Sequence, residues 1–180
     1  MLTITVPGRE LWNEKEEKFY TLPEQTLQME HSLISLSKWE SKYKKPWFSK
    51  KEKTSEETRY YVKCMTITQN VPDETYYLLT NEDIDKVNAY IEDPMTAAKF
   101  KSMHGRRHNG EFVTAETFYY WMVSFNLPEK CEKWHLNRLI ALIMMCNEKN
   151  KPAKKVGRRQ SLNNFIALNE KRLKQFNTKG

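Results

Sequence analysis

The four histidines and three cysteines of this 180-residue sequence, which could bind a metal or transfer a proton, are widely scattered. Cys131 and His135 lie four residues apart, so on a helix both would face the same side and could share a metal ion. No second pair of ligands follows them, and two protein ligands make a weak site. His104 and His108 flank two arginines, a pattern that could bind a phosphate or a metal but is more often a solvated basic loop. The sequence therefore predicts no metal site.

The motifs of the common enzyme classes are absent from the sequence. It contains no phosphate-binding loop of the G-x-x-x-x-G-K-[ST] or G-x-G-x-x-G type and no G-x-S-x-G nucleophile motif. With only five glycines in the chain, nucleotide hydrolysis is disfavoured. The three cysteines are too widely spaced for a C-x-x-C site and are best explained as small core residues. We therefore predict that the protein is not an enzyme and has no cofactor.

Bulky aromatic side chains offer a different chemistry, the recognition of another chain. Trp47 and Phe48 stand in a lysine-rich stretch broken by proline, where core packing explains them less readily, so we predict that they contact a partner. His31, Trp39 and Trp134 are weaker candidates for the same role, because each is more readily explained as a core residue. Lysines interleaved with aromatics could also hold nucleic acid through phosphate contacts and base stacking. These residues alone leave protein and nucleic-acid partners open.

The positive charge of the protein is concentrated at its C-terminal end. Residues 151–180 carry nine basic side chains and one acid, a net charge of +8, whereas the first 150 residues have a net charge of −1. Lys154, Lys155, Arg158 and Arg159 form the densest part of this basic tail. Such segregation marks an arm that contacts an acidic partner or nucleic acid, or a tail that only keeps the chain end in solution. The near-neutral remainder weighs against a dedicated nucleic-acid-binding protein.

Hydrophobic periodicity and capping patterns predict the elements that would position these residues. Alternation and β-branched residues predict three short strands, at 1–7, 18–22 and 26–33. Helical spacing, capping residues and prolines predict a series of helices. We expect them to run from Ser32 to before Pro46, from Thr54 to Pro72, from Thr80 to before Pro94, from Thr114 to Pro128, from there to about Asn147, and from Ser161 to Phe176. The lysine-rich segment 44–53 and the polar segment 99–110 are predicted loops.

Together these elements predict an α+β fold class, with a small N-terminal β-hairpin or sheet, a bundle of about four to five helices and a basic C-terminal tail. We expect one globular domain in residues 1–150, and a linker with a marginal amphipathic helix in residues 151–180. The longest apolar run, Leu139–Cys146, is far shorter than the roughly 20 residues a membrane helix needs. The first residues lack the features of a signal peptide. We therefore expect a cytosolic protein without a membrane partner.

Several segments resemble one known family. The stretch from Thr26 to Glu57 reads TLQMEHSLISLSKWESKYKKPWFSKKEKTSEE, an E-H-S-L-x-S-L-S-K-W-E core followed by K-P and by S-K-K-E-K-T-x-E-E. Further segments follow in the same order: LW at 11–12, MTITQNV at 65–71, YYWM at 119–122 and CEKWHLNRLIALI at 131–143. In these segments, which span most of the first 150 residues, the chain resembles the tail assembly chaperones encoded in the tail-gene block of long-tailed bacteriophages, the siphoviruses.

The resemblance implies a non-catalytic chaperone that acts in the host cell cytoplasm during assembly of a long flexible tail. Such proteins are thought to coat the helix-rich tape measure protein, to bring tail tube subunits to it and to be absent from the mature virion. Self-association is a further expectation. In many such phages ribosomal frameshifting near the end of the gene gives a longer form, and the basic tail is where we would look for that event. Two other interpretations stay open, a structural virion protein of the tail or of head–tail completion, and a nucleic-acid-binding accessory protein.

Overall fold

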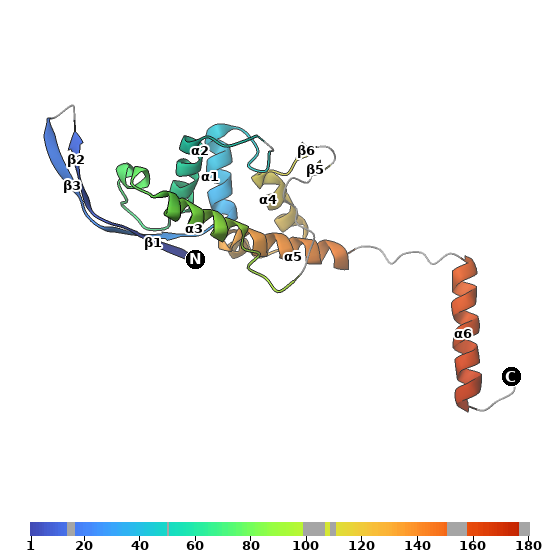
Figure 1. Ribbon diagram of the computed structural model, residues 1–180. Helices are drawn as coiled ribbons and strands as arrows, with labels where there is room; N and C mark the ends of the chain where they lie inside the picture. The colour runs from blue at the N-terminus through green and yellow to red at the C-terminus, as the bar shows by residue number, and fades with distance from the viewer. Residues whose placement is uncertain (14–16, 50, 99–106, 109–110, 151–157, 177–180) are drawn as a thin grey trace. The chain divides into compact units, whose positions relative to one another are not determined.

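The computed structural model describes residues 1–13, 17–49, 51–98, 107–108, 111–150 and 158–176, and its fold is α+β (Figure 1). The strands in these residues are β1 (Leu2–Val6), β2 (Arg9–Asn13), β3 (Lys18–Leu22), β4 (Gln25–Met29), β5 (Arg107–His108) and β6 (Glu111–Phe112). The helices are α1 (Leu33–Tyr43), α2 (Ser55–Met65), the 3-10 helix η1 (Asp73–Tyr77), α3 (Asn81–Glu92), α4 (Ala115–Ser124), the 3-10 helix η2 (Glu129–Lys133), α5 (Leu136–Lys149) and α6 (Arg158–Phe176). The predicted α+β class is confirmed, with somewhat more helices than expected. The chain divides into two compact units, Met1–Asn147 and Glu148–Gly180.

A long antiparallel hairpin opens the fold and extends beyond the helices of the first unit (Figure 1). β1 pairs with β4 at its base, and β2 pairs with β3 farther out. Two residues separate the ladders on each strand, so both ladders share one register. Pro7 and Pro23 lie at this interruption, where a proline removes no ladder hydrogen bond. β2 is missing from the sequence prediction, because its five residues show little alternation and become a strand by pairing with β3.

Local side-chain hydrogen bonds determine where three of the helices begin. Ser32, Thr54 and Thr80 are the N-cap residues of α1, α2 and α3, and each forms a capping box with the residue three positions later. In α2 the Thr54 hydroxyl accepts the Glu57 N–H at 3.2 Å, and the Glu57 carboxylate accepts the Thr54 N–H at 3.1 Å. These bonds satisfy N–H groups that a helix start leaves without an intrahelical partner. The helix starts predicted at Thr54 and Thr80 are thereby confirmed.

α2 is shorter than the sequence prediction, which placed its end at Pro72. The helix ends at Met65, because the chain that follows joins the β-ribbon. The Met65 carbonyl accepts the N–H of Glu30 at 2.9 Å, and the Ile67 N–H donates to the Gln28 carbonyl at 2.7 Å. Pairing with the end of β4 thus replaces the hydrogen bonds that would continue the helix.

The single helix predicted after Pro128 is also wrong, since it is divided into η2 and α5 at Trp134 and His135. Trp134 is extended, and the Leu136 N–H donates to the carbonyl of His31 at 2.6 Å. The acceptor of this bond, His31, lies far from Leu136 in the sequence. The break in the helix is therefore a consequence of tertiary contact, which periodicity does not reveal.

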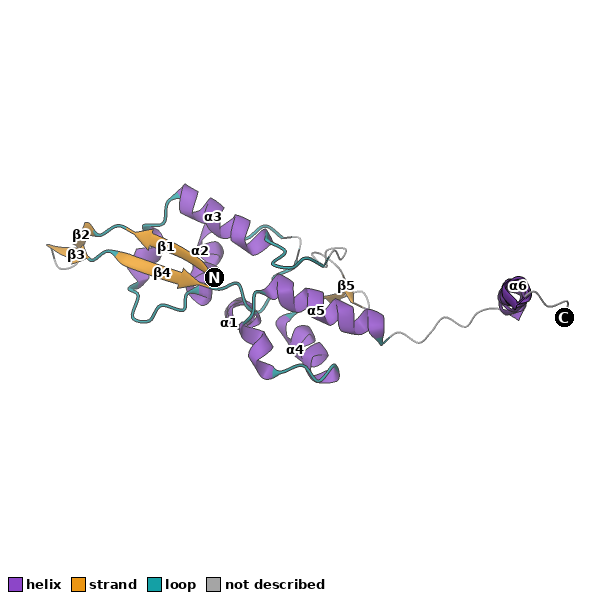
Figure 2. Cartoon of the chain, turned by 90° about the horizontal axis from the view of Figure 1, so that it is seen from below, coloured by secondary structure: helices purple, strands orange, loops and turns teal. Residues whose placement is uncertain are grey.

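Two hydrophobic clusters form the core of the first unit, and α1 contributes to both. The first cluster gathers side chains from the base of the hairpin, α2, η1 and α3, together with Trp39 of α1. The second gathers side chains from α4, η2 and α5, together with Leu33 and Leu36 of α1. α1 contacts α2, α4 and η2 directly, and Figure 2 shows α1 beside α4. Separating the two clusters would therefore expose apolar side chains of α1 on one side or the other.

The second unit contains the longest described helix, the 19-residue α6. It begins three residues before the predicted Ser161 and ends at the predicted Phe176. Lys154 and Lys155, in the predicted linker, lie outside the described residues, as does most of the predicted loop at 99–110. Within the described ranges, no helix combines the length and the apolar character needed to cross a membrane.

We predict that Gly8→Ala loosens the hairpin at its interruption. A Cβ atom at position 8 would lie 2.9 Å from the Leu22 carbonyl oxygen and 3.0 Å from the Glu24 amide nitrogen, so the strands would have to move apart. We expect this strain to cost about 1–3 kcal/mol. Hydrogen exchange of the β2 and β3 amides should become roughly tenfold faster or more. Thr3→Ala, at an exposed position of β1, is the matched control. Exchange at the wild-type rate in Gly8→Ala would contradict the close approach.

Candidate functional site

The two histidines of the family-like segments meet inside the first unit. The ring centroids of His31 and His135 are 5.1 Å apart, and both side chains are buried. A hydrogen bond of 2.6 Å joins Nδ1 of His31 to the hydroxyl of Tyr61 in α2. The tertiary structure therefore brings together two residues that the sequence analysis treated separately. Because His31 is only 1% exposed, its side chain contacts the interior of the protein in this conformation and is not available to another chain.

His135 is held as a neutral imidazole by its hydrogen bonds and its burial. Its Nδ1 accepts the N–H of Asn137 at 3.3 Å, so the ring proton belongs on Nε2, which donates to the Tyr90 carbonyl at 3.0 Å. Burial is the main cause that lowers the pKa of His135, although the Tyr90 carbonyl acts in the opposite direction. Tyr90 and Glu30 complete this polar network. The Tyr90 hydroxyl donates to the Glu30 carboxylate at 2.7 Å. The network connects the end of β4 to α3 and α5.

Neither the network nor the surrounding residues form a metal site. In the described part of the chain no three side chains of the ligand types lie close enough to share an ion. Cys131, the sequence candidate for a metal ligand with His135, is a buried member of the second hydrophobic cluster. The imidazole of His135 already uses both nitrogens in hydrogen bonds. The histidines therefore serve packing and connection in this structure.

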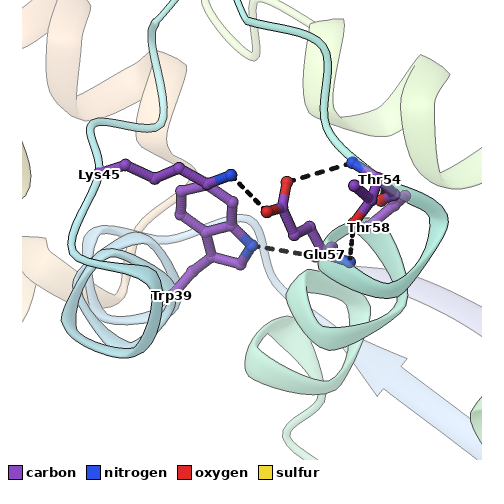
Figure 3. Close-up of polar contacts among 5 residues, drawn as sticks. All are labelled: Trp39, Lys45, Thr54, Glu57 and Thr58. Atoms are coloured by element: carbon purple, nitrogen blue, oxygen red, sulfur yellow. Dashed lines mark hydrogen bonds and ion pairs between the residues drawn. The ribbon is translucent and has the colours of Figure 1, made fainter.

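Trp39 and the lysine-rich stretch after it are tied to the start of α2 (Figure 3). The indole N–H of Trp39 donates to the main-chain carbonyl of Glu57 at 2.9 Å. The Glu57 carboxylate forms an ion pair with Lys45. This contact is the main cause that lowers the pKa of Glu57. Trp39 is 1% exposed. Its burial favours the packing role that the sequence also allowed.

Trp47 and Phe48, the first candidates for a partner contact, are half-buried and belong to the core packing. The Trp47 ring stacks on Tyr61 with a centroid distance of 3.8 Å and meets Trp39 edge to face at 4.9 Å. Phe48 meets Phe118 of α4 at 6.0 Å. Tyr61 thus contacts both His31 and Trp47, a role that no short-range pattern around it in the sequence indicates. The loop bridges the two clusters instead of presenting a free aromatic anchor.

The remaining sequence candidates lie apart from this centre. Trp134 is half-buried at the break between η2 and α5, where the Arg138 guanidinium lies 4.3 Å from its ring centroid. Arg158 and Arg159 form the first residues of α6 in the second unit.

Glu40 attaches two segments to α1 through its buried carboxylate. One oxygen accepts the N–H of Trp47 at 2.7 Å, and the other accepts the N–H of Ala115 at the start of α4, also at 2.7 Å. Burial raises the pKa of this carboxyl, while the two N–H groups act in the opposite direction. A single side chain thus positions both the aromatic loop and α4. No motif in the sequence indicated this role, since a lone glutamate on a helix is usually solvated.

Large apolar side chains are exposed at several places, among them Tyr77 of η1 and Tyr120 and Val123 of α4, and they form groups on the hairpin and on α6. Trp12 and Phe19 face each other across β2 and β3 with a centroid distance of 4.9 Å, and they are 50% and 70% exposed. In register they continue the row that includes Ile4 and Leu27, which is buried at the base of the hairpin. α6 exposes a second set, which is described below. These are the surfaces of the described chain best suited to another macromolecule.

A small surface pocket between α1, α2 and η1 is less suited to binding. Its volume is about 130 Å³, well below the roughly 300 Å³ or more of typical small-molecule sites. Lys63 and Asp73 on its wall are already paired at 2.7 Å, and the Lys42 ammonium rests over the Tyr60 ring at 3.7 Å. The polar groups of the pocket thus satisfy one another.

We predict that Glu40→Ala strongly destabilises the first unit. The substitution leaves two N–H groups, of Trp47 and Ala115, without their acceptor, at a cost of about 2–4 kcal/mol in the free energy of unfolding. Glu40→Gln keeps one acceptor oxygen and should lose less. Glu82→Ala removes an exposed acid from the first turn of α3 and serves as the control in urea denaturation. Equal stabilities of Glu40→Ala and the control would disprove the bridging role.

We predict that stability falls in mild acid because of His135. Its folded pKa is lowered, so below about pH 6.5 the unfolded chain binds a proton that the folded chain refuses. The contribution is complete above pH 6.5 and is lost toward the folded pKa, at up to about 1 kcal/mol per pH unit. The charged groups that influence it are Glu30, Asp93 and the N-terminal amine. Urea denaturation at pH 7.5 and 5.5 should show a smaller pH dependence for His135→Gln than for wild type. An unchanged pH dependence would refute the prediction.

A comparison of the chain with protein-family models, with curated proteins and with solved structures finds no match. The function proposed for it therefore relies on the family-like segments of the sequence and on the two exposed apolar surfaces. The family-like segments contribute mainly to the folded interior, because the side chains of His31, Trp39 and His135 in these segments are all buried.

Proposed function

We propose that the chain is a non-catalytic tail assembly chaperone of a long-tailed bacteriophage. In this role it binds the tape measure protein and tail tube subunits in the host cytoplasm and leaves before the virion is complete. The proposal is supported by the family-like segments, which run in one order from Leu11 to Ile143. It is also supported by the exposed apolar side chains of the hairpin, which provide a surface for binding.

The observation that carries the proposal is the exposed aromatic pair on the hairpin. Trp12 and Phe19 lie on β2 and β3, which extend beyond the helical body and pair with no third strand in the described residues (Figure 1). An isolated two-stranded ribbon is only marginally stable in water, and large aromatics on it are energetically costly to leave exposed. A partner with an apolar stripe, such as an unassembled helical protein, would cover them. The ribbon therefore has the properties of an arm that is completed by binding.

The size of this surface suits a temporary contact. Covering the two rings would remove on the order of 200 Å² of apolar area from water, or about 5 kcal/mol before the costs of association. Those costs are of similar size, so the pair alone does not give tight binding. A chaperone has to release its client when the tail is built. Weak contacts spread over more than one surface meet this requirement.

The basic C-terminal segment favours one alternative, a nucleic-acid-binding accessory protein. Its net charge of +8 would attract phosphates. The first 150 residues have a net charge of −1, so they add no net positive charge that would attract phosphates. A structural virion protein is the other alternative, and it differs from the chaperone in remaining in the finished particle. The experiments below distinguish each alternative from the chaperone.

We predict that the full chain, co-produced with the tape measure and tail tube proteins of its phage, co-purifies with at least one of them. Trp12→Ser with Phe19→Ser should weaken this association about tenfold or more, because the exposed rings are its apolar contact. Thr5→Ala with Thr26→Ala is the matched control, since these exposed residues form a cross-strand pair on the opposite face of the hairpin. Circular dichroism should show that both variants keep the helical fold.

Mass spectrometry of purified virions completes this test. We expect the chain to be absent from the particles, whereas its presence at fixed stoichiometry would establish a structural component instead. Failure of the wild-type chain to bind either partner would refute the chaperone. Binding to duplex DNA at physiological salt, with a steep salt dependence, would favour the nucleic-acid alternative.

A further inference from the structure

α6 carries an apolar stripe that is exposed to solvent. Leu162, Phe165, Ile166 and Leu173 recur at i, i+3, i+4 and i+11, which places them along one side of the helix. Phe165 and Ile166, at the middle of the stripe, are 64% and 47% exposed. Phe176 extends it at the C-terminal end and is also exposed. A surface helix normally buries such a stripe, but no other described element of the second unit covers that of α6.

The charges of α6 show what kind of surface would cover it. The helix contains five basic residues, Arg158, Arg159, Lys171, Arg172 and Lys174, and a single acid, Glu170. Arg172 directly precedes Leu173 of the stripe and is exposed. Basic groups beside an apolar stripe favour an acidic rim around an apolar groove, because the ion pairs and the buried stripe then form together.

The same charges argue against two other occupants. A second copy of α6 would bring two helices of net charge +4 together, with only one acid on each to compensate. Nucleic acid would pair with the basic side chains but would leave the aliphatic and aromatic stripe without a matching surface. A protein groove satisfies both features of the helix, and it follows the helix-in-groove mode in which residues at i, i+3 and i+4 act as anchors.

We infer that α6 is a docking helix, which binds an apolar groove with an acidic rim on a protein partner through Leu162, Phe165, Ile166 and Leu173. This inference rests on the proposed function, since the groove belongs to one of the two assembly partners. Most of the stability of a helix in a protein comes from packing of its apolar face, and no other described element of the second unit packs on that of α6. Binding therefore also orders it, and part of the contact energy is used in that step.

The test uses the full chain co-produced with the tape measure and tube proteins. Phe165→Ser with Ile166→Ser removes the middle of the stripe and should weaken binding to one partner about tenfold or more. Arg172→Glu with Lys174→Glu should weaken the same interaction and reduce its dependence on salt. Asn163→Ala with Gln175→Ala changes exposed polar residues of the same helix and should bind as wild type. All three pairs lie in the second unit, so the thermal unfolding of the first unit provides a check on folding.

The outcomes separate this inference from the proposed function. If the stripe variant binds both partners as well as wild type, the docking helix is refuted while the chaperone function stands. If wild type binds neither partner, both are refuted. Binding to duplex DNA tests nucleic acid as the occupant, and sedimentation of the chain alone tests a second copy. Binding to phosphatidylglycerol vesicles tests an anionic membrane surface. Loss of vesicle binding, DNA binding or self-association in the stripe variant, with partner binding intact, would overturn the acidic protein groove.

Discussion

The first unit depends on the junction between β4 and α1, at His31 and Ser32. The His31 carbonyl accepts the Leu136 N–H, and the side chain of the same residue bonds to Tyr61 and meets His135. Ser32 then caps α1. Because the junction is buried, each polar group must find a partner inside the protein, and these partners come from α2 and α5. The position of the hairpin, the start of α1 and the start of α5 are consequently set together.

α1 extends this constraint from the junction to both hydrophobic clusters. Trp39 packs on the side of the hairpin, while Leu33 and Leu36 pack on the side of α4 and α5. Glu40 then uses its two oxygens to hold the Trp47 loop and the first turn of α4. The residues that carry the family resemblance are thus mostly scaffold residues. Their spacing is demanding because one short helix has to serve two cores.

The surfaces available to a partner lie outside this scaffold. The aromatic pair of the hairpin and the stripe of α6 are exposed, in the first and the second unit respectively. An interior that is closely packed by aromatic rings and buried hydrogen bonds can hold a projecting ribbon in a defined position. This division suits a protein that must bind without chemistry, since the scaffold stays constant while exposed groups associate and dissociate.

Local features could be predicted from the sequence because their partners lie a few residues away. The capping boxes at Thr54 and Thr80 join residues three positions apart, and the α+β class follows from alternation and helical spacing. Contacts between distant residues could not be predicted in this way. The meeting of His31 with His135 and the burial of Trp47 against Tyr61 are of this kind. By itself the sequence determined the helix starts at Thr54 and Thr80, the fold class and the amphipathic pattern of the last helix. Only the tertiary structure decided which aromatics are scaffold and which are exposed, because burial depends on neighbours that no short segment contains.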